Sequence, residues 1–351
     1  MNTNRSILFI LPVASHPRFS KRINSYLKLG FKVTVLSFER NYFNKNTLPN
    51  NIEFISLGEI KSKKYFRRIP VLLSAIFKIL RTSKNKDSVY IFSQDILIFH
   101  GLFIKKSKII YEIGDLRIIK NWLIQQIINF LNRIILSKIS KVVVTSEGFL
   151  DFLIMKYQLP RKKIEIIENK FPKGFLDSKC DFKSINEDYI VGIVGNFRYS
   201  CLIDFLMSYS NQSKKNKFKI MLFGGGELLP QIMSYVDDTN IFYCGQFKYP
   251  DDLNEIYNQI DLSFVMYDSD DINVRLALPN KLYESMAFKK PLVVSNNTLL
   301  SKKVHEYGVG FSWSKNEMTE LNRFLNSEKF KLYYNALKGN FEKFKPEIYS
   351  S

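Results

Sequence analysis

The sequence predicts an α/β protein made of two doubly wound, Rossmann-like domains, each built on a parallel sheet. Short apolar strands alternate with amphipathic helices, which is typical of parallel sheets covered by helices on both faces. The alternation breaks once, in an irregular polar stretch within residues 169–186, and then starts again. A chain of 351 residues is long enough for each domain to bury a core of its own.

The first domain, residues 1–172, contains seven apolar segments of strand length. A helix is expected at Phe19–Leu29, between the first two strands, because Gly30 is the residue type that most often ends a helix. The expected strands are Ile7–Leu11, Lys32–Ser37, Ile52–Leu57, Val89–Phe92, Lys108–Tyr111, Lys141–Thr145 and Ile164–Ile167.

The second domain, residues 173–327, repeats this rhythm with five expected strands. A last helix, within residues 328–351, spaces its aromatic residues three and four apart, which predicts a core-packing stripe. The expected strands are Tyr189–Val194, Lys219–Phe223, Ile241–Cys244, Leu262–Val265 and Leu292–Ser295.

Positive charge is concentrated in the first half of the chain. The formal net charge is +19, and residues 1–180 carry 32 lysines and arginines against 12 acids. This asymmetry indicates a polyanionic partner, either a membrane or a nucleic acid. Three cysteines without paired spacing predict neither a disulfide framework nor a zinc site, which favours a reducing cytoplasm. No apolar run reaches transmembrane length, and the apolar start is interpreted as a strand rather than a signal peptide.

The segment at residues 61–86 favours lipid as that partner. It contains nine basic residues and no acid, and apolar residues recur at helical spacing from Ile69 to Leu80. A broad apolar face bracketed by basic clusters suits an interfacial helix, so the segment predicts binding to an anionic membrane surface. An ordinary core-facing helix with solvated lysines is the alternative. A second apolar stretch, Ile118–Ile139, is interpreted as core packing.

The most informative motif begins at Pro279 and runs into the strand Leu292–Ser295. Lys281 and Glu284 are three residues apart, so they project from one side of the first turn of a short helix. The unpaired N–H groups of that turn and the helix dipole make a seat for phosphate. A carboxylate beside such a seat can accept hydrogen bonds from sugar hydroxyls. A surface Lys–Glu pair on a capped helix is the other interpretation.

This block resembles the donor-binding segment of the retaining glycosyltransferases of family 4, often called group 1. In many members it reads P-x-K-x-x-E-x-M-A-x-x-x-P and is followed by an apolar strand. The resemblance implies the GT-B fold, in which two domains face each other across a cleft and the last helix crosses back to the first domain. It also implies a nucleotide-sugar donor, retention of the anomeric configuration and no metal cofactor. The matching residues are Pro279, Lys281, Glu284, Met286, Ala287 and Pro291.

Two glycine-containing turns extend the resemblance. Gly195 follows the first strand of the second domain, and Arg198 offers a rigid cation for a diphosphate. The glycines at 224–226 match the family's Gly-x-Gly turn beside the nucleotide, and Phe247 lies where relatives pass the base. The implied catalytic residues are Arg198, Lys281 and Glu284. The implied donor-binding residues are Gly195, Gly224, Gly225, Gly226, Phe247, Pro279, Asn280 and Leu282.

The sequence also departs from the family pattern. The lysine that relatives carry a few residues after Arg198 is missing. Relatives often place an acid seven residues before Glu284, where this chain has Leu276. The candidate substitutes just upstream are Asp268, Asp270, Asp271 and Asn273. An Asp-x-Asp after an apolar strand is also the metal-binding motif of the other large glycosyltransferase fold. Because two series of strands and helices do not fit that single-domain plan, no metal site is predicted.

The acceptor-side candidates lie in loops of the first domain. Relatives often have Pro-Arg after the first strand and Tyr-Asp/Glu-x-His-Asp after a later one, and Gly114 stands where that histidine would be. Each candidate also suits a purely structural role. The candidates are His16, Arg18, Glu112 and Asp115.

These features predict a retaining glycosyltransferase that moves a sugar, from a UDP-sugar, to a lipid-linked saccharide. It would act at the cytoplasmic face of a bacterial cell membrane, as a peripheral protein, in capsule, O-antigen or exopolysaccharide synthesis. A non-catalytic GT-B scaffold for another transferase is one alternative, suggested by Leu276 and Gly114. A nucleotide-sugar epimerase is another, although three histidines are few for its acid–base chemistry. The donor motifs oppose nucleic-acid binding.

Overall fold

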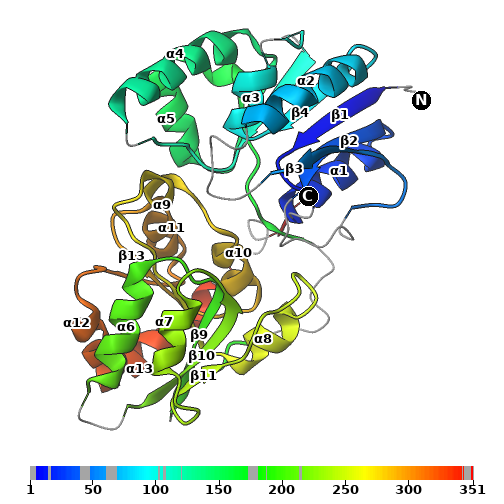
Figure 1. Cartoon of the computed structure of the whole chain (residues 1–351). Coiled ribbons are helices and arrows are strands. Elements are labelled where there is room, and N and C mark those ends of the chain that lie inside the picture. The colour runs from blue at the N-terminus through cyan, green and yellow to red at the C-terminus, as the bar shows by residue number, and fades with distance from the viewer. Residues whose placement is uncertain are drawn as a thin grey trace. The chain divides into compact units, whose positions relative to one another are not determined.

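The structure, a computed structural model, divides into two compact units, residues 1–168 and 169–351. The first runs from blue to green in Figure 1 and the second from green to red. Each unit has a parallel sheet of its own, which confirms the prediction of two doubly wound α/β domains. The structure describes residues 5–14, 17–39, 48–60, 69–101, 103–105, 108–119, 121–172, 181–186, 188–212, 216–341, 343 and 349–350.

The first unit has a seven-stranded sheet in the order β3-β2-β1-β4-β5-β6-β7. Its strands are β1 (Ser6–Leu11), β2 (Lys32–Glu39), β3 (Glu53–Glu59), β4 (Ser88–Phe92), β5 (Ile109–Ile113), β6 (Lys141–Val144) and β7 (Ile164–Ile166). Its helices are α1 (Pro17–Lys28), α2 (Ile69–Ser83), α3 (Gln94–His100), α4 (Trp122–Lys138) and α5 (Glu147–Tyr157).

The central strands of this sheet are buried on both faces, as their continuous apolar runs predicted. The chain order runs outward from β1 in one direction and from β4 in the other. Because such crossovers are right-handed, α1 covers one face of the sheet and α3 and α4 cover the other. Helices α2, α3 and α4 are neighbours in one layer (Figure 1).

The second unit has a six-stranded sheet in the order β11-β10-β9-β12-β13-β14. Its strands are β9 (Tyr189–Asn196), β10 (Phe218–Gly225), β11 (Ile241–Tyr243), β12 (Leu262–Val265), β13 (Leu292–Ser295) and β14 (Gly310–Trp313), and the short β8 (Phe171–Pro172) pairs with β15 (Tyr349–Ser350). Its helices are α6 (Ser200–Ser210), α7 (Leu229–Ile232), α8 (Leu253–Gln259), α9 (Ile272–Leu276), α10 (Asn280–Ala287), α11 (Leu299–Tyr307), α12 (Met318–Leu325) and α13 (Glu328–Ala336).

The last helix, α13, packs on the core of the second unit. Phe330 and Tyr334 are buried, and the Tyr334 hydroxyl donates to the carbonyl of Asp261 at 2.8 Å. The aromatic stripe is therefore a core element, as its spacing indicated. The return of this helix to the first domain stays a prediction.

The predicted membrane segment is described only from Ile69, where α2 begins, and its basic cluster at residues 61–68 lies outside the described residues. None of the helices in the described part of the chain is long and apolar enough to cross a membrane.

Candidate functional site

The predicted donor residues gather at one edge of the second sheet. The strand order reverses between β9 and β12, and ligands of open α/β sheets bind at the carboxyl ends of strands beside such a reversal. Gly195 lies at the carboxyl end of β9, and Gly224 at that of β10. Helix α10, which carries Lys281 and Glu284, directly precedes β13.

Glu284 is the centre of a buried polar cluster. Its side chain comes from α10, and the residue is only 1% exposed. Its Oε2 atom lies 2.5 Å from Lys281 Nζ and accepts a hydrogen bond from the Tyr257 hydroxyl at 3.0 Å. Burial and the negative charge of Glu284 raise the pKa of Tyr257 well above its usual range. The tyrosine therefore stays protonated and donates to the carboxylate at neutral pH.

Lys281 connects this cluster to the other loops that are predicted to bind the donor. Its Nζ atom lies 5.7 Å from the centroid of the Phe247 ring, within the range of a cation–π contact. A methyl group on Gly195 would lie 3.5 Å from Lys281 Cε. The structure thus brings together Gly195, Phe247 and the Lys281–Glu284 pair, which come from three separate segments.

The start of α10 has no side-chain cap. Pro279 occupies the N-cap position with extended backbone angles, and its side chain cannot accept a hydrogen bond. Asn280 makes a side-chain hydrogen bond with Tyr249, whereas Leu282 is fully buried. Pro279 and Leu282 can therefore serve a ligand only through their backbone. The backbone N–H groups of an uncapped first turn can bind an anion.

The glycines at 224–226 allow two loops to pack backbone against backbone. Gly224 has φ +137°, and a Cβ atom on it would lie 1.9 Å from the carbonyl oxygen of Gly195. Gly226 has φ +152°, and a Cβ atom there would lie 2.5 Å from the Phe197 carbonyl oxygen. Only glycine suits these positions, so the turn fixes the loop that carries Arg198. Close approach of a nucleotide to these glycines stays a prediction.

Arg198 is exposed on this loop and stacks on its neighbour. Its guanidinium carbon lies 4.8 Å from the centroid of the Tyr199 ring, which in turn lies 4.7 Å from the Tyr267 ring. Tyr267 follows β12, so the end of β12 supports the loop after β9. This support holds the cation at the carboxyl edge of the sheet.

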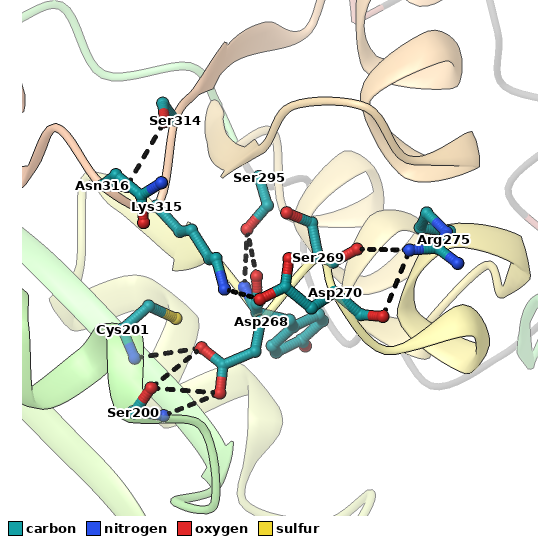
Figure 2. Close-up of polar contacts among 11 residues, drawn as sticks. Ser200, Cys201, Asp268, Ser269, Asp270, Arg275, Ser295, Ser314, Lys315 and Asn316 are labelled. Atoms are coloured by element: carbon teal, nitrogen blue, oxygen red, sulfur yellow. Dashed lines mark hydrogen bonds and ion pairs between the residues drawn. The ribbon is translucent and has the colours of Figure 1, made fainter. Parts of the chain in front are cut away.

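Asp268 fixes the start of α6 (Figure 2). Its carboxylate accepts hydrogen bonds from the backbone N–H of Ser200 at 3.0 Å and of Cys201 at 3.1 Å, and from the Ser200 hydroxyl. The carboxylate therefore occupies the N-terminus of α6 that would otherwise attract a phosphate. Burial and the nearby Asp268 charge raise the pKa of the Cys201 thiol, which stays protonated.

The other two acids of this loop also have structural partners. Asp270 accepts from the ammonium group of Lys315, which approaches from the loop after β14 (Figure 2). Asp271 is the N-cap of α9 and accepts from Asn273 N at 2.8 Å. Among the described residues, no group of three or more histidines, cysteines or acids could hold a metal ion. Metal independence stays a prediction.

Replacing Asp268 with alanine is expected to lower the free energy of unfolding by about 1–2 kcal/mol, because α6 loses its cap. The loop that carries Arg198 would also loosen, so the affinity for a nucleoside diphosphate should fall. Urea unfolding and calorimetric titration with UDP measure the two effects. Asp270→Ala is the control, because the Asp270 carboxylate pairs with Lys315 instead of the first turn of α6. Unchanged stability and UDP affinity in Asp268→Ala would contradict this role.

The acceptor-side candidates in the described part of the first unit have different surroundings. His16 lies outside the described residues, and Asp115 is exposed. Arg18, on α1, lies against Gly114, where a Cβ atom would be 1.9 Å from Arg18 Nη1. The arginine thus fills the space that a side chain at position 114 would need. A side chain at position 114 would displace the guanidinium group, which is the flexible end of Arg18.

Glu112 is part of a buried network in the first unit. It is 1% exposed, and its carboxylate accepts from Arg22 Nε at 2.9 Å and from the Tyr90 hydroxyl at 2.7 Å. Burial and this carboxylate raise the pKa of Tyr90 well above its usual range. Arg22 also donates to the carbonyl of Ile167, so the network joins α1, β4 and β5 to the end of the sheet. A contact between Glu112 and an acceptor stays a prediction.

Sequence reasoning missed several residues that shape the site. Tyr257, Tyr267 and Lys315 come from α8, from the end of β12 and from the loop after β14. None of the three belongs to a sequence motif, because each contacts its partner only through tertiary packing. The one available signal was the position of Tyr267 directly after a buried strand.

A family model matches the part of the chain that carries this site. Residues 188–320 match the model described as Glycosyl transferases group 1. This segment contains every predicted donor residue. No curated protein matches the sequence at a significant level.

Solved structures match nearly the whole chain. HepE from Anabaena, in complex with UDP and glucose, has a TM-score of 0.71 and 15% identity, over 99% of this chain and 96% of that one. Sucrose-phosphate synthase from Thermosynechococcus elongatus has a TM-score of 0.69 and 13% identity, over 99% and 95%. WaaG, a glycosyltransferase involved in lipopolysaccharide biosynthesis, has a TM-score of 0.69 and 12% identity, over 97% and 95%. These similarities confirm the predicted fold class, a GT-B pair of Rossmann-like domains.

Proposed function

We propose that this protein is a retaining glycosyltransferase that moves a sugar from a UDP-sugar to a lipid-linked saccharide. The observation that carries the proposal is the Lys281–Glu284 pair at the uncapped start of α10, beside the glycine turns of β9 and β10. The family match over residues 188–320 supports it. HepE, which shares the fold, was solved with UDP and with UDP-glucose, and this supports UDP as the nucleotide.

In this proposal each donor residue has a distinct task. The Lys281 ammonium and the Arg198 guanidinium stabilise the negative charge that develops on the departing diphosphate. The uncapped N–H groups of α10 add hydrogen bonds to the same phosphates. Glu284 accepts from the ribose hydroxyls and holds Lys281 in place through its Oε2 atom. The acceptor hydroxyl attacks from the face that the diphosphate leaves, so the configuration is retained.

The proposed pathway is the assembly of a bacterial surface polysaccharide. Galactosyltransferase WaaB of the lipopolysaccharide outer core and WaaG share the fold, which supports this class of product. The basic first half of the chain suits an acceptor carried by an anionic membrane. The protein would then work as a peripheral protein at the cytoplasmic face, with residues 61–86 near the lipid.

Lys281→Met is expected to weaken UDP binding by about 10- to 100-fold, because a charge-assisted hydrogen bond to phosphate is lost. Lys303→Met is a matched control, since Lys303 forms the same i,i+3 pair with Glu306 on α11, away from the site. Calorimetry with UDP measures both affinities, and assays with a panel of nucleotide sugars measure transfer. Turnover should persist in EDTA. If no nucleoside diphosphate binds, the proposal is wrong, whereas binding with epimerisation or without transfer would support an alternative function.

A further inference from the structure

Helix α4 exposes large apolar side chains on its outer side. Four of them, near the start of the helix, are between 61% and 69% exposed: Trp122, Leu123, Ile127 and Phe130. The opposite side of the helix is buried through Ile135 and Leu136. The interpretation of Ile118–Ile139 as core packing is therefore wrong for the outer side of α4. An apolar surface of this kind needs a partner, because water solvates it poorly.

Helix α2 repeats this arrangement in the same layer. Phe77 is 83% exposed and Leu73 is half exposed, whereas Leu72 and Ile79 face the sheet. Helix α3 lies between α2 and α4 and contacts both, so the two outer sides belong to one face of the first unit (Figure 1). The exposed apolar residues of this face, called here the α2–α4 face, are Leu73, Phe77, Trp122, Leu123, Ile127 and Phe130.

Helices α2 and α4 carry basic residues and no acid, and Asp95 on α3 between them is paired with Arg117. The chain has no acid from Leu116 to Ser146 and none at residues 60–86, and the two stretches together contain 14 lysines and arginines. On each helix the basic residues follow the apolar ones. Arg133 and Lys138 come after the exposed residues of α4, and Lys78 and Arg81 flank or follow Phe77 on α2.

This combination identifies the partner by its chemistry. An apolar protein surface or a second copy of this chain would match the side chains of the α2–α4 face but not its charge, and two such faces would repel each other. A bilayer with anionic head groups offers an apolar interior for the tryptophan, leucine, isoleucine and phenylalanine and negative charge for the lysines and arginines. We infer that the α2–α4 face docks the protein on an anionic lipid bilayer, with the first half of α4 inserted at the interface.

The geometry of α4 suits insertion at the interface rather than across it. At 1.5 Å per residue, its 17 residues span about 25 Å, but only its first two to three turns are apolar on the outer side. Trp122 stands at the start of the helix, and tryptophan is the residue type that best occupies the head-group region. This inference extends the proposed function, because it names the surface that would meet a lipid-linked acceptor. Vesicle binding is measured without nucleotide sugar, so either proposal can fail without the other.

The first test is co-sedimentation of the full chain with vesicles of phosphatidylcholine and phosphatidylglycerol. The triple substitution Leu123→Gln, Ile127→Gln and Phe130→Gln should reduce partitioning by about 100-fold or more, because each inserted side chain contributes roughly tenfold. Leu29→Gln is the matched control. Leu29 is 67% exposed at the end of α1, which covers the opposite face of the sheet, and its substitution should change partitioning less than about twofold.

The second test uses the only two tryptophans of the chain, Trp122 and Trp313. Trp313→Phe leaves Trp122 as the sole reporter. Its emission should move to shorter wavelength when anionic vesicles are added, and brominated acyl chains should quench it. Unchanged emission at a lipid concentration that sediments the protein would overturn the proposed insertion of α4.

The third test separates charge from insertion. Lys78→Gln, Arg81→Gln and Lys138→Gln together should weaken binding to anionic vesicles by about tenfold or more and leave binding to pure phosphatidylcholine unchanged. Thermal unfolding and UDP affinity verify that every variant is folded. If the triple variant on α4 is not folded, the single substitution Leu123→Gln replaces it in the test. Wild-type partitioning in the folded α4 variant would overturn the inference. The inference would also be overturned if the wild-type protein were a dimer and these substitutions made it a monomer without changing vesicle binding.

Discussion

Replacing Glu284 with glutamine is expected to reduce kcat/KM for the nucleotide sugar by about 100-fold or more. The carboxylate accepts from Lys281 and Tyr257 through one oxygen, and glutamine cannot balance the ammonium charge 2.5 Å away. Hydrogen bonds to charged groups contribute about 1.5–3 kcal/mol, and a buried charge left without its partner costs about 3–5 kcal/mol. The proposed contact with the ribose would be lost, and Lys281 would no longer be held in place. Steady-state kinetics with the donor identified in the panel measures the effect.

Two substitutions separate the chemical role of Glu284 from its structural role. Glu306→Gln changes the same i,i+3 pair on the exposed surface of α11 and should leave kcat/KM unchanged. Tyr257→Phe removes one buried hydrogen bond but keeps the Lys281–Glu284 pair, so it should lower stability more than activity. If Glu284→Gln lost stability but kept its kcat/KM within about twofold, the pair would be a structural element and not part of the donor site.

Replacing Gly224 with alanine is expected to destabilise the protein by about 3 kcal/mol or more. The backbone at this position has φ +137°, which alanine rarely adopts, and the new Cβ atom would lie 1.9 Å from the Gly195 carbonyl oxygen. The neighbouring backbone cannot move away cheaply, because Gly224 N donates to the Gly245 carbonyl at 2.7 Å. Urea unfolding measures the loss of stability. Titration with UDP measures whether the affinity also falls, as expected if the loops after β9 and β10 become less ordered.

Gly245→Ala is the control that isolates the clash. Gly245 also has a positive φ, +88°, but a Cβ atom there meets nothing within 4 Å. Its substitution should cost only the conformational strain, about 1–2 kcal/mol. Equal losses of stability in the two variants would show that strain alone, and not the packing of the β9 and β10 loops, makes glycine necessary at position 224.

Much of the fold could be predicted because its signals are local. A strand buried on both faces is a continuous apolar run, and all twelve expected strands are present with ends that shift by at most two residues. β14 was missed because Gly310–Trp313 is short, begins with glycine and contains a serine. The helix end at Gly30 was equally local, since this glycine has a positive φ.

The site was predictable only where its parts are close in sequence. Lys281 and Glu284 pair because they are one helical turn apart, and their spacing alone indicated this. The contact of Tyr257 with Glu284 spans 27 residues and depends on how α8 packs beside α10. The hydrophobic periodicity of a sequence does not predict a contact between residues so far apart. The acids at 268–271 were suggested as ligand contacts, and this stays a prediction. In the structure Asp268 accepts from the start of α6, Asp270 pairs with Lys315, and Asp271 is the N-cap of α9.

The same limit explains the wrong interpretation of α4. Periodicity tells which residues of a helix are apolar, but α4 is apolar on more than one side. Only the position of the sheet decides which side is buried. Leu123 and Ile135 are equally apolar in sequence, yet the first is exposed and the second is fully buried.

The contact between Arg18 and Gly114 links two positions that lie 96 residues apart. The atom that a side chain at 114 would meet is Nη1, at the far end of the flexible Arg18 side chain, and no backbone atom is that close. A larger residue at 114 would therefore displace the guanidinium group rather than the backbone. The two positions are coupled in this way, because the identity of residue 114 decides where the positive charge of Arg18 can lie.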